Sequence, residues 1–381
     1  GDEGGRSGDE QQTNQGAADH GSGGRVAEDA SRSRTMARYD RIASEGVEVI
    51  GGEMVRILGQ SDPLIRSQEW LDFVVSMDIS RMEEVVAAFR SRELVAMHQN
   101  EYAILLSRWA NEEPEAALSY IEDELPSGDS ERSIILARWA ESDLQSALAW
   151  AEQNPSGKEG LNLSLLYVAE GIATSQPALV AQLLETQSMV RERQVTLNQF
   201  IPKIMSIGVE EAKLWPSYFE DPSLRAAAES RIAASLVMED PQGTMEWIDG
   251  LEGPGRDSAY SKAVAALAVV DTETALDYAL EAPSDSLRKE SFAGIVRSTA
   301  RRDPRQAADL LDAHPEVVTD RGIQGLIWYS VQKDPAVGAE YLSRIEGEQA
   351  LEGSLRTLKA NWRSRDPAAL ESWLAENPQY N

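Results

Sequence analysis

The chain has 381 residues, of which 42% are hydrophobic, and a formal net charge of −28 at pH 7. The hydrophobic content is that of a folded protein, whereas the charge argues against nucleic acid and anionic lipid as partners, because both require a basic surface. With no cysteine in the sequence, disulfides, thiolate zinc sites and cysteine nucleophiles are excluded. No apolar run approaches the ~18 residues of a membrane-spanning helix.

Residues 1–34 are dominated by Gly, Ser, Asp, Glu and Gln. Ordering such a segment costs backbone entropy and buries almost nothing, so we predict a flexible low-complexity tether. Because a polar tether of this kind often follows an export signal, we expect a soluble protein of the bacterial periplasm or cell envelope. Helices are predicted over 35–59 and 63–76. Together, residues 35–76 are expected to cap the N-terminal end of the repeat array.

From residue 77 to residue 381, one phrase recurs with a period of about 32 residues. An acidic residue and a proline are followed by a small residue three places later and a large one six places later. A period of this length is typical of solenoids built from small helical units. The positions equivalent to the proline are taken as anchors, and they are Ile79, Pro114, Leu144, Pro177, Val209, Pro241, Thr272, Pro304, Pro335 and Pro367.

Asp-Pro predicts the start of a helix. The Asp carboxylate accepts a bond from an orphan backbone N–H, and proline fits the first helical position. Proline also forces the preceding helix to stop. In five units a second proline follows the anchor by about eleven residues and ends the first helix, at Pro126, Pro155, Pro283, Pro315 and Pro378.

Each unit is therefore predicted as two short helices joined by turns. Positions 0, 3, 6 and 7 after the anchor share one helix face, and one pair of helices cannot bury that face alone. The sequence thus predicts an all-α fold, an α–α superhelix (solenoid) of about ten two-helix repeats. Six tryptophans at periodic positions are expected in the packing between repeats, namely Trp109, Trp139, Trp150, Trp247, Trp362 and Trp373.

Two groups of residues are candidates for a binding surface. Trp70 and Trp328 lie outside the periodic positions. Five arginines near the predicted starts of second helices form either a groove for a carboxylate-bearing segment or local ion pairs with Asp and Glu, and they are Arg132, Arg225, Arg256, Arg288 and Arg321.

The phrase Asp-Pro-x-x-Ala-x-x-Trp/Tyr, as in DPAALESW and DTETALDY, resembles the first helix of tetratricopeptide repeats. The longer phrase WAxxDPxxALxW resembles bacterial helix-hairpin repeat proteins of unknown function, and HEAT-like packing is the related alternative. The resemblance covers residues from about 77 to 381. It implies a superhelix used for protein interaction and carries over no catalytic or ligand residue.

Three short motifs were weighed as sites of chemistry. His98 and Glu101 share a helix face, as metal ligands do, but no partner histidine motif accompanies them. Ser286 and Lys289 fit Ser-x-x-Lys without its companion motifs, and PSGKEG (155–160) lacks most of a phosphate loop. We therefore predict no catalytic, cofactor-binding or metal residue and no cofactor.

The leading hypothesis is a non-enzymatic scaffold that binds a protein or peptide, of unknown identity, on the concave face of the solenoid. The second is a glycan-binding or glycan-cleaving protein of the cell envelope, which would require two close carboxylates and exposed aromatics. The third is a purely structural spacer with a featureless concave surface.

Overall fold

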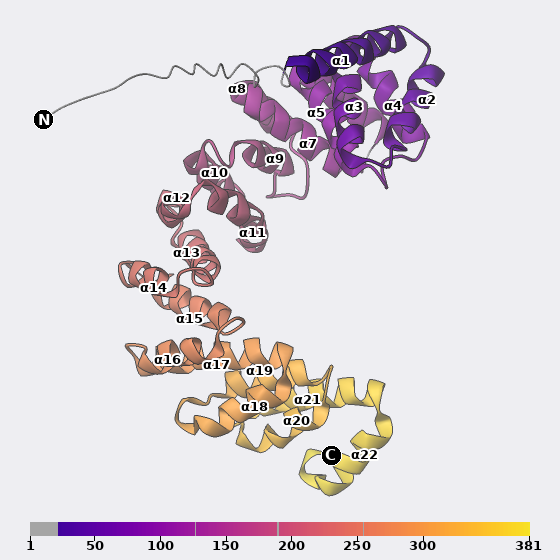
Figure 1. The fold of residues 1–381 in the computed structure, drawn as a ribbon. Helices are drawn as coiled ribbons and strands as arrows, with labels where there is room; N and C mark the ends of the chain where they lie inside the picture. Colours follow the sequence, from indigo (N-terminus) through magenta and orange to yellow (C-terminus); the bar gives the residue numbers. More distant parts are fainter. Residues whose placement is uncertain (1–21, 126, 189, 254) are drawn as a thin grey trace, which may run out of the picture. The chain divides into compact units, whose positions relative to one another are not determined.

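The computed structural model describes residues 22–125, 127–188, 190–253 and 255–381 (Figure 1). Throughout these ranges the regular structure is helical, with no β-strand, which confirms the predicted all-α class. The chain divides into two compact units, one that ends at Gln153 and one that begins at Asn154. None of the described helices is long and apolar enough to cross a membrane.

In the first unit, α1, α3, α5 and α7 pack side by side in chain order, and α2 and α4 pack against each other in a second layer. The helices of this unit are α1 (Ser22–Ala43), α2 (Val47–Leu58), α3 (Pro63–Ser76), the 3-10 helix η1 (Ile79–Arg81), α4 (Met82–Ser91), α5 (Gln99–Glu112), α6 (Pro114–Glu124), α7 (Asp129–Ser142) and α8 (Leu144–Gln153).

The second unit has the same plan, and its odd-numbered helices from α11 to α21 pack in sequence. Its helices are α9 (Leu163–Ile172), α10 (Pro177–Glu185), α11 (Val190–Ile207), α12 (Val209–Leu214), η2 (Trp215–Tyr218), α13 (Pro222–Leu236), α14 (Pro241–Asp249), α15 (Gly255–Leu267), α16 (Thr272–Glu281), α17 (Asp285–Arg302), α18 (Pro304–Ala313), η3 (Pro315–Val317), α19 (Asp320–Ser330), α20 (Pro335–Glu340), η4 (Leu342–Arg344), α21 (Glu348–Arg365), α22 (Pro367–Glu376) and η5 (Pro378–Tyr380).

Every predicted anchor is the first residue of a helix. Ile79 opens the 3-10 turn that leads into α4, and the other anchors open the even-numbered helices from α6 to α22. First helices also end just before the second prolines, as α16 does before Pro283 and α18 before Pro315. Pro126 lies outside the described residues.

The residue before the anchor caps the new helix in six of the seven units where it is Asp. Glu113 makes no cap bond, because its longer side chain does not suit the short reach to the first N–H groups. Asp334 makes an ion pair of 2.9 Å with Arg305 instead of a cap. Carboxylates that accept a backbone N–H at the helix start belong to Asp78, Asp143, Asp240, Asp271, Asp303 and Asp366.

Aromatic pairs join one repeat to the next. A tryptophan late in a second helix meets the large residue six places after the anchor of the following helix. The small residues three places after the anchor, such as Ala147 and Ala307, are fully buried. The ring pairs, with their centroid separations, are Trp109 and Tyr120 (5.6 Å), Trp139 and Trp150 (6.5 Å), and Trp362 and Trp373 (5.7 Å).

The start of α1 changes the boundary expected for the tether. Residues 1–21 lie outside the described residues, but residues 22–34 are helical and continue into the packed part of α1. Ala, Arg and Glu in this stretch favour a helix, and Tyr39 and Ile42, which are buried later in α1, hold the helix on the unit. Composition alone therefore missed the helical part of this segment.

Replacement of Trp362 tests the packing between repeats. We expect Trp362→Ala to lower the free energy of unfolding by about 3–5 kcal/mol, because the side chain is buried against Trp373 and leaves a cavity. Trp328→Ala is the matched control, since Trp328 is 62% exposed and its loss should cost within about 0.5 kcal/mol. Urea unfolding followed by circular dichroism measures the free energy of unfolding of both variants. Equal losses of stability in the two variants would contradict a packing role for Trp362.

Acid should weaken the helix starts. In Asp78, Asp143 and Asp271, hydrogen bonds from a Ser or Thr hydroxyl and from backbone N–H groups lower the pKa below its ordinary value of 3.8. Their stabilisation is present above pH 3.8 and is lost as the pH falls through the lower folded-state pKa.

The variant Asp78→Asn/Asp143→Asn/Asp271→Asn keeps side chains that can cap but removes their titration. We therefore expect a flatter loss of stability than in the native chain between pH 4 and pH 2, measured by thermal unfolding. An unchanged pH profile would show that these carboxylates do not contribute.

Candidate functional site

Four of the five predicted arginines make local contacts. Arg132 pairs with Asp129 in its own first turn, and Arg225 donates to the Phe219 carbonyl just before its helix. Arg256 pairs with Asp249 at 2.7 Å in the same way. Arg288 likewise donates to the Ala282 carbonyl and to Asp285. These contacts fix the helix starts and do not build a shared groove.

Four of the five arginines occupy equivalent helix faces, but each donates to a local partner. Arg225, Arg256 and Arg288 lie sixteen residues before the next anchor, and Arg132 lies twelve before, which is one turn away on the same face. Arg321 lies fourteen before, and two residues correspond to about 200° around an α-helix, so its side chain points in another direction. Arg321 alone among the five reaches a neighbouring second helix, where it pairs with Glu290 of α17 at 2.9 Å.

Trp70 is not part of a binding surface, because it belongs to the core of the first unit. It is fully buried, its ring stacks on Phe73 and its Nε1 donates to the Glu101 carbonyl at 3.0 Å. Trp70 lies outside the repeat period but is not exposed, because α3 packs between α1 and α5 and supplies residues to the core.

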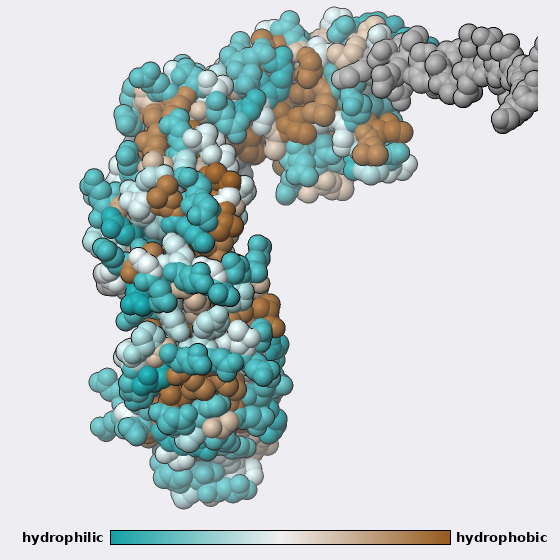
Figure 2. All heavy atoms as spheres, turned by 60° about the vertical axis from the view of Figure 1, so that its left-hand side comes forward, coloured by the Kyte–Doolittle hydropathy of each residue, from teal (hydrophilic) through white to brown (hydrophobic). Residues whose placement is uncertain are grey.

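Trp328 lies in a hollow of about 320 Å³ between α17, α19 and α21. Figure 2 shows a molecular surface that is largely hydrophilic and is interrupted by separate hydrophobic patches. Trp328 is 62% exposed, so its indole offers a flat apolar surface. The lining is Arg297, Arg321, Gln324, Gly325, Ile327, Trp328, Gly353, Ser354 and Thr357, and it contains no carboxylate.

Helix periodicity brings these residues onto one face. Arg297 and Trp328 each lie seven residues before the next anchor, and Glu290, Arg321 and Gly353 each lie fourteen before. Seven residues are about two turns, so both positions face the same side of α17, α19 and α21. These helices pack in sequence and lie side by side in the lower part of Figure 1.

Gly325 positions Arg297. A Cβ atom at Gly325 would lie 2.2 Å from Cγ of Arg297, so the arginine stem rests directly on the α19 backbone. Arg297 is half-buried and makes no hydrogen bond or ion pair with other residues in the part of the chain that the structure describes. Its guanidinium is therefore held at the hollow and available to a ligand.

Further cations flank this face. Lys262 of α15 is exposed and makes no hydrogen bond or ion pair with any described residue. Its pKa is lowered mainly by desolvation and then by the positive charges of Arg297, Arg321 and Arg231, while Glu290 opposes the shift. The face thus carries a local excess of positive charge on a chain whose net charge is −28.

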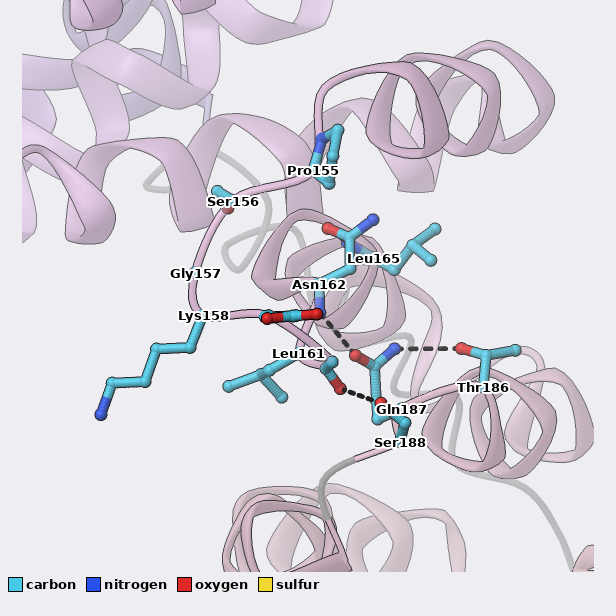
Figure 3. A pocket seen from close by; sticks show the side chains of 12 residues that line it. Pro155, Ser156, Gly157, Lys158, Leu161, Asn162, Leu165, Thr186, Gln187 and Ser188 are labelled. Carbon is cyan, nitrogen blue, oxygen red and sulfur yellow. Dashed lines mark hydrogen bonds between the residues drawn. The ribbon is translucent and has the colours of Figure 1, made fainter.

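A second hollow, of about 430 Å³, surrounds the PSGKEG loop between α8 and α9 (Figure 3). The buried Gln187 holds this loop, since its Oε1 accepts from the Asn162 N–H at 2.6 Å and its Nε2 donates to Thr186 Oγ1 at 3.0 Å. Lys158 extends away from these groups. The polar atoms of this hollow are used for loop structure, and nothing in it is arranged as a phosphate loop.

The other short motifs are also engaged locally. The Nδ1 atom of His98 lies 3.9 Å from Glu101, and the described residues hold no group of three or more His, Cys, Asp and Glu side chains placed for a metal ion. The ammonium of Lys289 pairs with Asp285 at 2.8 Å at the exposed start of α17.

Comparison of the chain with protein-family models, curated proteins and solved structures gave no match.

Trp328 and Arg321 were predicted from the sequence, whereas Arg297, Lys262 and Gly325 were not. The available signal was the anchor register, because Arg297 occupies the position equivalent to Trp328 one repeat earlier. Alignment of second helices on the following anchor, and not on their uncertain starts, would have brought these residues together.

Two glycines of the hollow give a matched test of how Arg297 is placed. Glycine to alanine in a helix interior normally stabilises by about 0.5–1 kcal/mol. Gly353→Ala should do so, because nothing lies within 4 Å of its added Cβ. Gly325→Ala should give no gain or a loss, since its Cβ meets the Arg297 stem, and equal stabilisation of both variants in urea unfolding would contradict the contact.

Proposed function

We propose that the chain is a non-enzymatic interaction scaffold that binds a segment of another protein in the hollow between α17, α19 and α21. The observation that carries the proposal is the exposed Trp328 beside Arg297, a half-buried cation without a partner among the described residues. Exposed Trp and Arg are the residue types that dominate the binding energy of protein interfaces.

The lining suits a protein segment. The space above Gly353 is open, so a bound backbone can approach closely there, and Gln324, Ser354 and Thr357 supply side-chain hydrogen-bond groups. The indole of Trp328 offers apolar area at low entropic cost, because a Trp side chain has few rotatable bonds. Glycan cleavage by two carboxylates would require acidic side chains, and this lining contains none.

A displayed library of random peptides tests the proposal on the purified full chain. We expect enriched sequences that bind the native protein, lose about tenfold or more in affinity with Trp328→Ala and Arg297→Gln, and keep their affinity with Arg256→Gln. Arg256 is the matched control because it is a surface arginine of the same unit that pairs locally with Asp249. Truncation of a central aromatic or arginine in an interface typically costs enough for such a loss.

Two outcomes would count against this function. Enrichment of no sequence above a blank support would remove the peptide site. Binding of oligosaccharides on a glycan array, lost in Trp328→Ala and without any peptide enrichment, would replace it by a glycan-binding function, in which the exposed ring stacks on sugars.

A further inference from the structure

The cation-rich face of α15, α17 and α19 has too few acidic partners of its own. Arg321 is paired with Glu290, while Lys262 and Arg297 make no hydrogen bond or ion pair with any described residue. The remainder of the chain is strongly acidic, with 64 Asp and Glu against 36 Lys and Arg. An acidic ligand that contacts this face would remove like-charge repulsion and would be repelled by most other parts of the surface.

The repulsion is visible at Lys262. Partial desolvation by the surrounding protein lowers its pKa most, and the charges of Arg297, Arg321 and Arg231 lower the pKa further. These positive charges therefore disfavour the charged form of Lys262, and Glu290 acts in the opposite direction. A ligand carboxylate between Lys262 and Arg297 would supply the missing opposite charge.

The helix spacing sets how far apart the carboxylates should be. Packed α-helices lie about 8–10 Å apart, and here small residues allow close approach, since a Cβ on Gly294 of α17 would lie 2.9 Å from the Ala265 Cβ of α15. A chain in the polyproline II conformation advances about 3.1 Å per residue with three residues per turn, so every third side chain lies on the same side. A segment that crosses the helices therefore meets a new helix at about every third residue.

We infer that the ligand is an acidic segment of a protein in the polyproline II conformation, which crosses α15, α17 and α19 with carboxylates at about every third residue facing Lys262, Arg297 and Arg321. An apolar side chain of the same segment lies on Trp328 at the hollow beside Arg321. This assignment rests on the proposed function and adds to it the chemistry and the spacing of the bound segment.

Charge density favours a carboxylate segment over a nucleic acid. Duplex DNA carries a charge at about every 1.7 Å and would extend beyond three cations onto acidic surface. A segment with one carboxylate per helix matches the sparse placement of the cations. The guanidinium of Arg297 suits a carboxylate because its fork of N–H donors binds both oxygens.

A set of labelled twelve-residue peptides tests the inference by fluorescence anisotropy with the purified full chain. The first peptide has Glu at every third position with Leu and Ser between, the second has Gln at the same positions, and the third has the same composition with all Glu adjacent. We expect the spaced Glu peptide to bind about tenfold tighter than either control and to weaken between 50 mM and 300 mM salt, because exposed charges are screened.

Variants locate the contact. Lys262→Gln and Arg297→Gln should each weaken the spaced Glu peptide several-fold without changing the affinity of the Gln peptide, and Arg256→Gln should change neither. Lys262 is exposed and makes no hydrogen bond or ion pair with the described residues, so its replacement keeps the test valid even where Arg297→Gln disturbs the packing on Gly325.

The results separate this inference from the function on which it rests. Equal affinity for the Glu and Gln peptides, or no effect of Lys262→Gln, would overturn the acidic segment while library peptides that require Trp328 still support the scaffold. Equal affinity for spaced and adjacent Glu would overturn the spacing. Tighter binding of a single-stranded oligonucleotide than of the spaced peptide would replace the protein ligand.

Discussion

Burial of apolar surface between successive helical pairs is the interaction on which the structure depends. A single pair leaves one face uncovered, and the neighbouring pair covers it with alanines such as Ala147 and Ala307 and with ring pairs such as Trp362 and Trp373. The buried clusters of the second unit accordingly run through several consecutive helices and are not confined to one pair. Stability in such arrays is the sum of small units and their interfaces.

Close packing of the second helices also creates the candidate site. Gly294 and Gly325 let α17 and α19 approach the preceding helices so closely that an added Cβ would clash. The same approach presses the stem of Arg297 onto backbone and leaves its guanidinium at the surface. In the proposed function, packing and ligand recognition use the same face, with small residues for the first and long cationic or aromatic residues for the second.

The helix starts could be predicted from sequence because their causes are local. Asp-Pro needs only the geometry of one turn, and the pattern therefore placed every anchor at a helix start, including Leu144 and Thr272, where proline is absent. The helical residues 22–34 were missed because their order depends on contacts made later in α1. A composition rule cannot include such a contact.

The candidate site was only half predictable for a related reason. Trp328 was selected because it broke the repeat, and the same criterion wrongly selected Trp70, since a position outside the period says nothing about burial. Four of the five arginines occupy equivalent helix faces but contact local partners, and Arg321 lies two residues out of that register on another face. Arg297 shares the anchor register of Trp328, and Lys262 shares that of Gly325, but their exposure and their lack of partners among the described residues are supplied only by the structure.

Equivalent positions on this face carry different residues. Fourteen residues before the anchors stand Glu290, Arg321 and Gly353, and seven before them stand Arg297 and Trp328. A perfectly regular array would offer a bound chain the same contacts at every step, so the chain could slide by one repeat, or by several, at no cost in energy. Irregularity along the stack gives a bound segment one preferred position and one direction, which identical repeats could not provide.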